Sequence, residues 1–189
     1  MSILRTNQIQ DTGTNVAANI SGGVVTFAQP PIGAFISVAD QWRLTGSTNQ
    51  GTNADVTSNW ARVNNSGWSS IGTGLTENSG IFSFASTGIY LIMLQAEFFM
   101  AAADDSAALQ LQITLNNSSY ETVMQTNSGG RPSGGGNTNQ GGAGFFLFNV
   151  TDITTHKFKF LTGSMGTNTK LQGSTTISKT GFIVMRLGA

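Results

Sequence analysis

The chain has 189 residues, which is enough for one domain with a short appendage. It contains no cysteine, which excludes disulfides, thiolate metal sites and a cysteine nucleophile. Nine basic and nine acidic residues give a net charge of zero, so we expect neither nucleic acid nor an anionic membrane as a partner. Only 10% of the residues are charged, and the polar remainder is rich in Asn, Ser, Thr, Gln and Gly, as on viral and extracellular surfaces.

The first 32 residues are polar, with scattered aliphatic side chains and no helical period. These aliphatics are too far apart to form a core alone, although they could dock against a partner. We therefore predict an extended N-terminal attachment arm over residues 1–32 and a single domain over 33–189. The candidate attachment residues of the arm are Ile3, Leu4, Ile9, Val16 and Ile20. The arm lacks the apolar stretch of a signal peptide, and no part of the chain approaches the ~18 apolar residues of a transmembrane helix.

From residue 33 onward, short apolar stretches alternate with turns rich in Gly, Asn and Ser, and no segment has a helical period. This pattern predicts an all-β protein with about eight to ten short strands in a sandwich or barrel. Residues 45–59 and 127–144 are expected to be polar loops, the second a mobile excursion. The expected strands cover residues 33–38, 60–63, 80–84, 89–100, 109–116, 120–125, 145–150, 156–161 and 180–187.

Two of these strands are apolar on both of their alternating faces. In 89–100, the even-numbered positions are all apolar, and Ile89, Leu91, Met93 and Phe99 occupy the other face. In 180–187, Phe182 and Val184 alternate with a second apolar set. A strand of a two-sheet sandwich needs only one apolar face, so we expect the second face to contact other subunits. The predicted interface residues are Ile89, Leu91, Met93, Phe99, Ile183, Met185 and Leu187.

Several segments of residues 33–189 resemble the superfamily of tumour necrosis factor and the complement globular head. They are the run from Trp60 to Trp68, the Gly80-x-Phe82 strand followed by Gly88-x-Tyr90, and the closing Ser178-x-x-Gly181-Phe182. The resemblance implies a ten-stranded antiparallel jelly roll that forms a trimer, with the 89–100 and 180–187 strands in the sheet that faces the other subunits. Ala85 stands where that family has Pro, and no collagen repeat or calcium-ligand set can be mapped.

The arm carries a second, independent resemblance. Its segment Leu4-Arg-Thr-Asn-Gln-Ile-Gln-Asp-Thr-Gly13 is similar to the opening of many structural proteins of marine and cyanobacterial tailed phages. This resemblance implies a protein of the virion surface, made in the host cytoplasm and attached through its arm to the major capsid protein or to another virion protein.

Few residues suggest a catalytic or metal-binding site. His156 is the only histidine, and it shares its strand face with Phe158 and Phe160, so we expect it to be packed in the core. Asp104 and Asp105 are expected in a solvated turn, and whether they bind calcium is left open because a calcium site needs more oxygen ligands. Glu97 could pair with Arg186 at a threefold axis, because a buried charge needs a partner.

Trp42, Trp60 and Trp68 could form a glycan platform, but the jelly-roll resemblance favours core positions for Trp60 and Trp68. The chain contains no phosphate-binding Gly-x-x-x-x-Gly-Lys-Ser/Thr, no Gly-x-Ser-x-Gly and no His-Glu-x-x-His motif. We therefore expect no catalysis, no cofactor and no metal.

The leading functional hypothesis is a trimeric decoration (cement) protein on a phage capsid, anchored by its arm. The alternative is a short tail fibre, spike or head fibre whose jelly-roll head binds a host-surface receptor or glycan through residues 45–59 and 127–144. A secreted cytokine-like ligand is disfavoured by the lack of a signal peptide.

Overall fold

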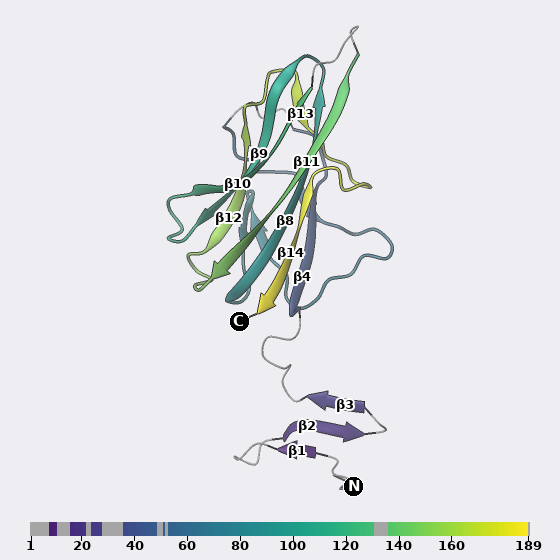
Figure 1. Ribbon diagram of the computed structural model, residues 1–189, viewed down its shortest axis with the longest axis vertical. Helices are drawn as coiled ribbons and strands as arrows, with labels where there is room; N and C mark the ends of the chain where they lie inside the picture. The colour runs from purple at the N-terminus through teal and green to yellow at the C-terminus, as the bar shows by residue number, and fades with distance from the viewer. Residues whose placement is uncertain are drawn as a thin grey trace, which may run out of the picture.

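The protein is described from a computed structural model, which covers residues 8–10, 16–21, 24–27, 36–48, 51, 53–130 and 136–188. Within these ranges, residues 36–188 form two antiparallel sheets that pack face to face (Figure 1). This arrangement confirms the predicted all-β antiparallel sandwich. Two short strands that the sequence pattern did not indicate, β6 (Thr76–Asn78) and β13 (Thr169–Leu171), bring the strands described in this part of the chain to eleven.

One sheet, called the β8 sheet, has the order β11-β8-β14-β4-β5, and β13 pairs with β8. Its strands are β4 (Val38–Leu44), β5 (Trp60–Arg62), β8 (Gly88–Met100), β11 (Thr138–Val150), β13 (Thr169–Leu171) and β14 (Gly181–Gly188). The other sheet, called the β9 sheet, has the order β10-β9-β12-β7-β6. Its strands are β6 (Thr76–Asn78), β7 (Ile81–Ser83), β9 (Asp104–Thr114), β10 (Glu121–Gly130) and β12 (Lys157–Gly163).

The inner faces of the two sheets bury a single apolar core, which is rich in aromatic rings. Phe82 of β7 is fully buried near its centre, with ring centroids 4.8 Å from Phe182 and 5.3 Å from Trp42. Phe158 of β12 stacks on Phe82 at 5.0 Å. Because these rings come from both sheets, burying them fixes the two sheets against each other.

The first strand of the sandwich lies later in the chain than the sequence pattern indicated. β4 begins at Val38, the last residue of the expected 33–38 strand, and residues 36 and 37 lie outside any strand. The sequence pattern did not indicate β4 because Asp40, a charged residue, occupies an inward position between Val38 and Trp42, where an apolar residue is expected. Its buried carboxylate accepts hydrogen bonds from the Trp42 indole, the Arg62 guanidinium and the Leu75 amide, which compensate for its desolvation.

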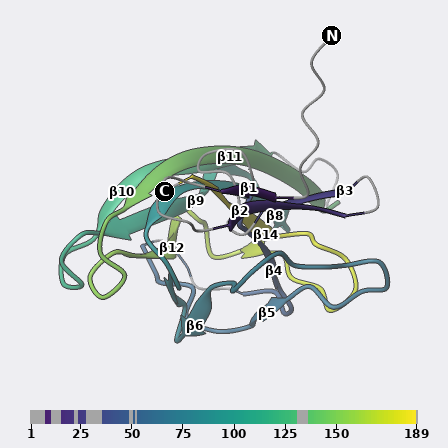
Figure 2. The same cartoon turned by 90° about the horizontal axis from the view of Figure 1, so that it is seen from below.

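The expectation of a mobile loop over 127–144 was wrong. β10 continues to Gly130, and β11 begins at Thr138 and pairs with β8 in an unbroken register. Residues 131–135 lie outside the described part of the chain. The polar, glycine-rich composition reflects an exposed edge, because β10 and β11 lie side by side at one edge of each sheet (Figures 1 and 2).

Glycine is required where β10 approaches β11. A Cβ atom on Gly142 would lie 1.9 Å from Oγ1 of Thr126, and one on Gly144 would lie 2.6 Å from Sδ of Met124. The missing side chains therefore let the two edge strands meet and close this side of the sandwich.

The other predicted loop, 45–59, has no strand among its described residues, but it is held to the sandwich. Thr48 pairs with Leu171, Asp55 pairs with Leu161, and Val56 is buried in the core. The described residues of this segment are therefore tied to β12, to β13 and to the core.

The arm contains three short strands, β1 (Gln8–Gln10), β2 (Val16–Ser21) and β3 (Val24–Phe27), which form an antiparallel sheet of their own. The sequence pattern indicated extended backbone here, which the strands have, but not their pairing with one another. Figure 1 shows this small sheet.

We predict that Gly142→Val lowers the free energy of unfolding by about 1–3 kcal/mol, because the new side chain overlaps Thr126. Gly141→Val is the matched control, since Gly141 is exposed and a Cβ there would come no closer than 3.2 Å to any neighbouring atom. The measurement is urea unfolding of both variants at one protein concentration. Equal stabilities for the two variants would contradict a steric role for Gly142.

Candidate interaction surfaces

In the fold, β8 and β14 each have one buried face and one partly exposed face. The even-numbered residues of β8 from Tyr90 to Met100 are at most 3% exposed, whereas Ile89 on the opposite face is 41% exposed. In β14, Phe182 and Val184 are buried, while Leu187 on the opposite side is 39% exposed. These strands therefore complete the core with one face and present a second apolar face to the outside.

The register of the β8 sheet joins this second face with residues of β11. Phe145 and Leu147 pair with Met93 and Leu91, respectively, and are 78% and 58% exposed. We define the apolar patch by the two cross-strand rows and the two residues at its end: Phe145, Met93 and Ile183; Leu147, Leu91 and Met185; and Ile89 and Leu187.

Sequence reasoning missed Phe145 and Leu147, although it predicted their strand. The segment Phe145-Phe-Leu-Phe148 is apolar at both parities, the same signal that identified β8 and β14. Phe148 and the half-buried Phe146 pack on the core, so their two neighbours in sequence are left on the outer face.

The apolar patch contains an open hollow of 310 Å³. Met93, Phe145 and Ile183 line it together with Gln41 of β4 and Ser178, which precedes β14. A hollow with apolar walls and few polar groups is suited to an apolar side chain from another molecule.

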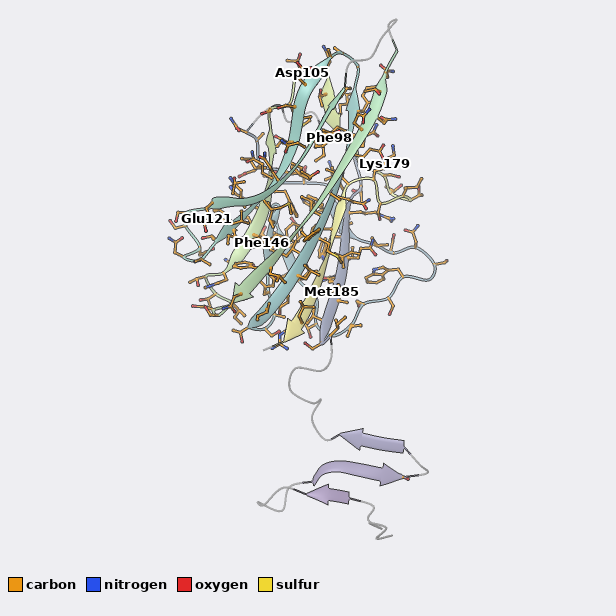
Figure 3. All side chains as sticks on the ribbon, viewed as in Figure 1. Phe98, Asp105, Glu121, Phe146, Lys179 and Met185 are labelled. Atoms are coloured by element: carbon orange, nitrogen blue, oxygen red, sulfur yellow. The ribbon has the colours of Figure 1, made fainter. Side chains whose placement is uncertain are left out.

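Farther along β8, the same face becomes polar. Glu97 forms an ion pair with Lys179 at 2.8 Å, beside a hollow of 510 Å³ that Gln95, Asn139 and Gln140 also line. In Figure 3, Lys179 marks this polar zone and Met185 marks the apolar patch.

Phe99 lies beyond Gln95 and Glu97, next to Asn139 and Lys170, so it is separated from the apolar patch. Within one chain, Arg186 donates to the Thr87 carbonyl and to Oγ of Ser37. The pair of Glu97 with Arg186 at a threefold axis stays a prediction.

The outward face of the β9 sheet is different in character. Gln110, Gln112, Thr122 and Gln125 form a ladder of hydrogen bonds between β9 and β10. Among the residues that the structure describes, the two outer faces of the sandwich are therefore unequal, and the large apolar surface lies on the β8 sheet.

Three of the predicted attachment residues, Ile9, Val16 and Ile20, lie in strands of the arm sheet. Ile9 pairs with Ala18, which also pairs with Phe27. Val16 pairs with Gln10, and Ile20 pairs with Val25. Ile3 and Leu4 lie outside the described residues.

The expectation that Asp104 and Asp105 lie in a turn was wrong, because both belong to β9. Asp104 is buried, and its Oδ2 accepts hydrogen bonds from the Gly166 amide, at 2.8 Å, and from Oγ1 of Thr169. Its carboxylate thus ties the start of β9 to the segment that leads into β13. Among the described residues, no group of three or more His, Cys, Asp or Glu side chains could hold a metal ion.

His156 is packed, as expected. It is 8% exposed, its ring lies against Phe148 at 5.8 Å, and its two nitrogens contact the hydroxyls of Thr151 and Thr155.

Trp42 and Trp60 are core residues, but Trp68 is only half-buried in the segment between β5 and β6, so its expected core position was wrong.

The part of the chain that the structure describes contains no helix that could cross a membrane.

No family model matches the sequence, and no curated protein matches it. Solved structures do match the fold. Murine APRIL at pH 5.0 aligns with a TM-score of 0.55 and 15% identity, covering 79% of this chain and 98% of the APRIL chain. Eiger TNF from S. frugiperda aligns with a TM-score of 0.57 and 13% identity, covering 82% of this chain and 94% of that one.

These similarities show that the chain has a TNF-like jelly-roll fold, as the sequence resemblance implied.

We predict that Asp104 makes stability depend on pH. Burial alone would raise the pKa of Asp104, but hydrogen bonds from Thr169, Gly166 and Ser106 bring it below its ordinary value of 3.8. A lowered pKa in the folded state means that the stabilisation is present above 3.8 and is lost as the pH falls through the folded-state pKa. Asp104→Asn should therefore lower the melting temperature at neutral pH.

The difference between Asp104→Asn and the wild type should shrink as the pH falls below 3.8 and through the lowered pKa of Asp104 in the folded state. Thermal unfolding across this range is the measurement, with the exposed neighbour changed as Asp105→Asn for comparison. A constant difference at every pH would show that the charge of Asp104 does not contribute.

Proposed function

We propose that the protein is a non-catalytic structural module that assembles as a homotrimer through the apolar patch and decorates the capsid of a tailed phage, to which its N-terminal segment attaches it. The observation that carries this proposal is the apolar patch itself. It spans three neighbouring strands, and Phe145 within it is 78% exposed. Contiguous apolar surface of this kind usually marks an interface, whereas scattered exposed side chains do not.

Covering the patch would stabilise an assembly substantially. Burial of one large apolar side chain contributes about 1.5–3 kcal/mol relative to leaving it exposed, and the patch holds several such side chains. The polar ladder on the β9 sheet offers no comparable gain, so association through the β8 sheet is favoured. Proteins with a TNF-like fold typically form homotrimers, which supports three copies rather than two.

Support for a virion comes from the arm, through its similarity to the opening of phage structural proteins. A surface with few charges and many amides and hydroxyls fits an exposed position on a particle. The alternative, a receptor-binding fibre, relied on two long loops. One of them, 127–144, is largely strand, and the other is held to the core, which leaves less free loop for recognition.

Leu91→Glu should convert the trimer into monomers, because a carboxylate at the centre of the apolar patch would have to be buried without a partner, at a cost of several kcal/mol. Gln110→Glu adds the same charge to the polar face of the β9 sheet and should leave the trimer intact. Light scattering coupled to size exclusion at micromolar concentration is the measurement. A monomeric wild type, or a Leu91→Glu trimer as stable as the control, would refute assembly through this patch.

Removal of residues 1–32 should leave a trimeric head that no longer joins particles, whereas the full chain should join them. The measurement is sedimentation of each protein with phage particles stripped of their own copies, followed by quantitative mass spectrometry. Hundreds of copies per particle would support decoration, whereas a few tens at most would favour the fibre. Binding of the truncated head to particles at full level would contradict attachment through the arm.

A further inference from the structure

The polar zone of the β8 sheet contains the hollow of 510 Å³, which we call the polar hollow. It lies over Gly141 of β11, which pairs with Glu97 of β8. Residues directly opposite each other in a sheet share a face, so a side chain at position 141 would point outward beside Glu97. Glycine leaves this space open, and the floor of the polar hollow is therefore backbone.

The side chains around the polar hollow hold one another in place. Nζ of Lys179 donates hydrogen bonds to Oε1 of Glu97 at 2.8 Å and to Oε1 of Gln172 at 3.1 Å. Nε2 of Gln172 in turn donates to Oδ1 of Asn139 at 3.0 Å. Because these bonds already restrict the side chains, a ligand would lose little free energy in ordering them.

Glu97 and Asn139 keep hydrogen-bonding capacity for a ligand. The bond from Lys179 uses one of the two oxygens of the Glu97 carboxylate, and the bond from Gln172 uses the carbonyl of the Asn139 amide, whose nitrogen carries two hydrogens. An acceptor and a donor that line one hollow match two neighbouring hydroxyl groups, of which one donates and the other accepts. An apolar ligand would instead leave both groups desolvated and unpaired.

The polar hollow is balanced in charge. Among the described residues that line it, the charged ones are Glu97 and Lys179, and they pair with each other, so neither an anion nor a cation is favoured. Gln95 lines both this hollow and the apolar hollow of Met93 and Phe145, so apolar surface begins where the polar hollow ends. A sugar ring, with hydroxyl groups at its edge and C–H groups on its faces, fits this combination.

We propose that the polar hollow binds a neutral saccharide, which accepts from the Asn139 amide, donates to the Glu97 carboxylate and lies over Gly141. This site goes beyond decoration of a capsid, and it does not depend on the trimer, because its lining residues all belong to one chain. A monosaccharide in a hollow this open should bind with a dissociation constant of about a millimolar.

The experiment is saturation-transfer NMR on the full-length protein, with the methyl glycosides of glucose, galactose, mannose and N-acetylglucosamine as separate probes. We expect transfer to at least one probe, and titration of that probe gives its dissociation constant. Light scattering on the same samples reports the oligomeric state, so a failed assembly and a missing saccharide site give different results. The absence of transfer to every probe overturns the proposal.

Gly141→Val should abolish transfer, because its side chain fills the space above the floor of the polar hollow. Gly188→Val is the matched control, since no described atom lies within 4 Å of a Cβ there and Gly188 pairs with Ile89, at the far end of β8 from Glu97. The control should bind like the wild type. Equal binding by the two variants contradicts a site over Gly141.

A second pair of variants tests the carboxylate without filling the hollow. Glu97→Gln keeps the size of the side chain but replaces an accepting oxygen by a donating nitrogen, so the dissociation constant should rise about tenfold. Glu121→Gln makes the same change at an exposed position of β10, in the other sheet, and should leave the dissociation constant unchanged. The same dissociation constant for both variants also overturns the proposal.

Discussion

The rest of the structure depends on β8 and β14, whose inner face is apolar throughout and whose outer face is also apolar over part of its length. The inner face meets the aromatic rings of β7 and β12 and is fully buried within one chain. The outer face has no such cover among the described residues, and the sheet extends it to Phe145 and Leu147. A sandwich satisfies one face only, so the second leads directly to the proposed assembly.

The other strands of the sandwich bury the inner face of β8 and β14. Phe82 alone contacts five aromatic side chains from both sheets. At the edge, β11 comes close to β10 because glycine occupies Gly142 and Gly144. Strand β11 therefore covers the core with one face and carries on the other Phe145, which is the most exposed large apolar side chain among the described residues.

Buried carboxylates act as ties within this scaffold. Asp40 connects β4 with β5 and with the segment before β6, and Asp104 connects β9 with the approach to β13. Both accept hydrogen bonds from backbone amides as well as side chains, which is how a buried charge becomes tolerable. Neither belongs to a cluster of acidic groups in the described chain, which fits a structural role.

The sequence by itself determined the fold class and the two apolar faces of β8 and β14. Successive side chains of a strand point to opposite faces, so a strand with apolar residues at both odd and even positions has two apolar faces. It also determined that Ile9, Val16 and Ile20 are the apolar elements of the arm, since their type is visible without their neighbours. Only the tertiary structure decided which apolar residues of the sandwich lie next to one another.

Phe145, which the sequence analysis did not include, belongs to the apolar patch because β11 pairs with β8. Phe99, which it did include, is separated from the patch because Gln95 and Glu97 lie between them on the same face of β8. The glycine-rich segment 127–144 looked like a loop because composition reports solvent exposure, and an edge strand is as exposed as a loop. Pairing between strands that are distant in sequence is what distinguishes the two, and that pairing is a property of the whole fold.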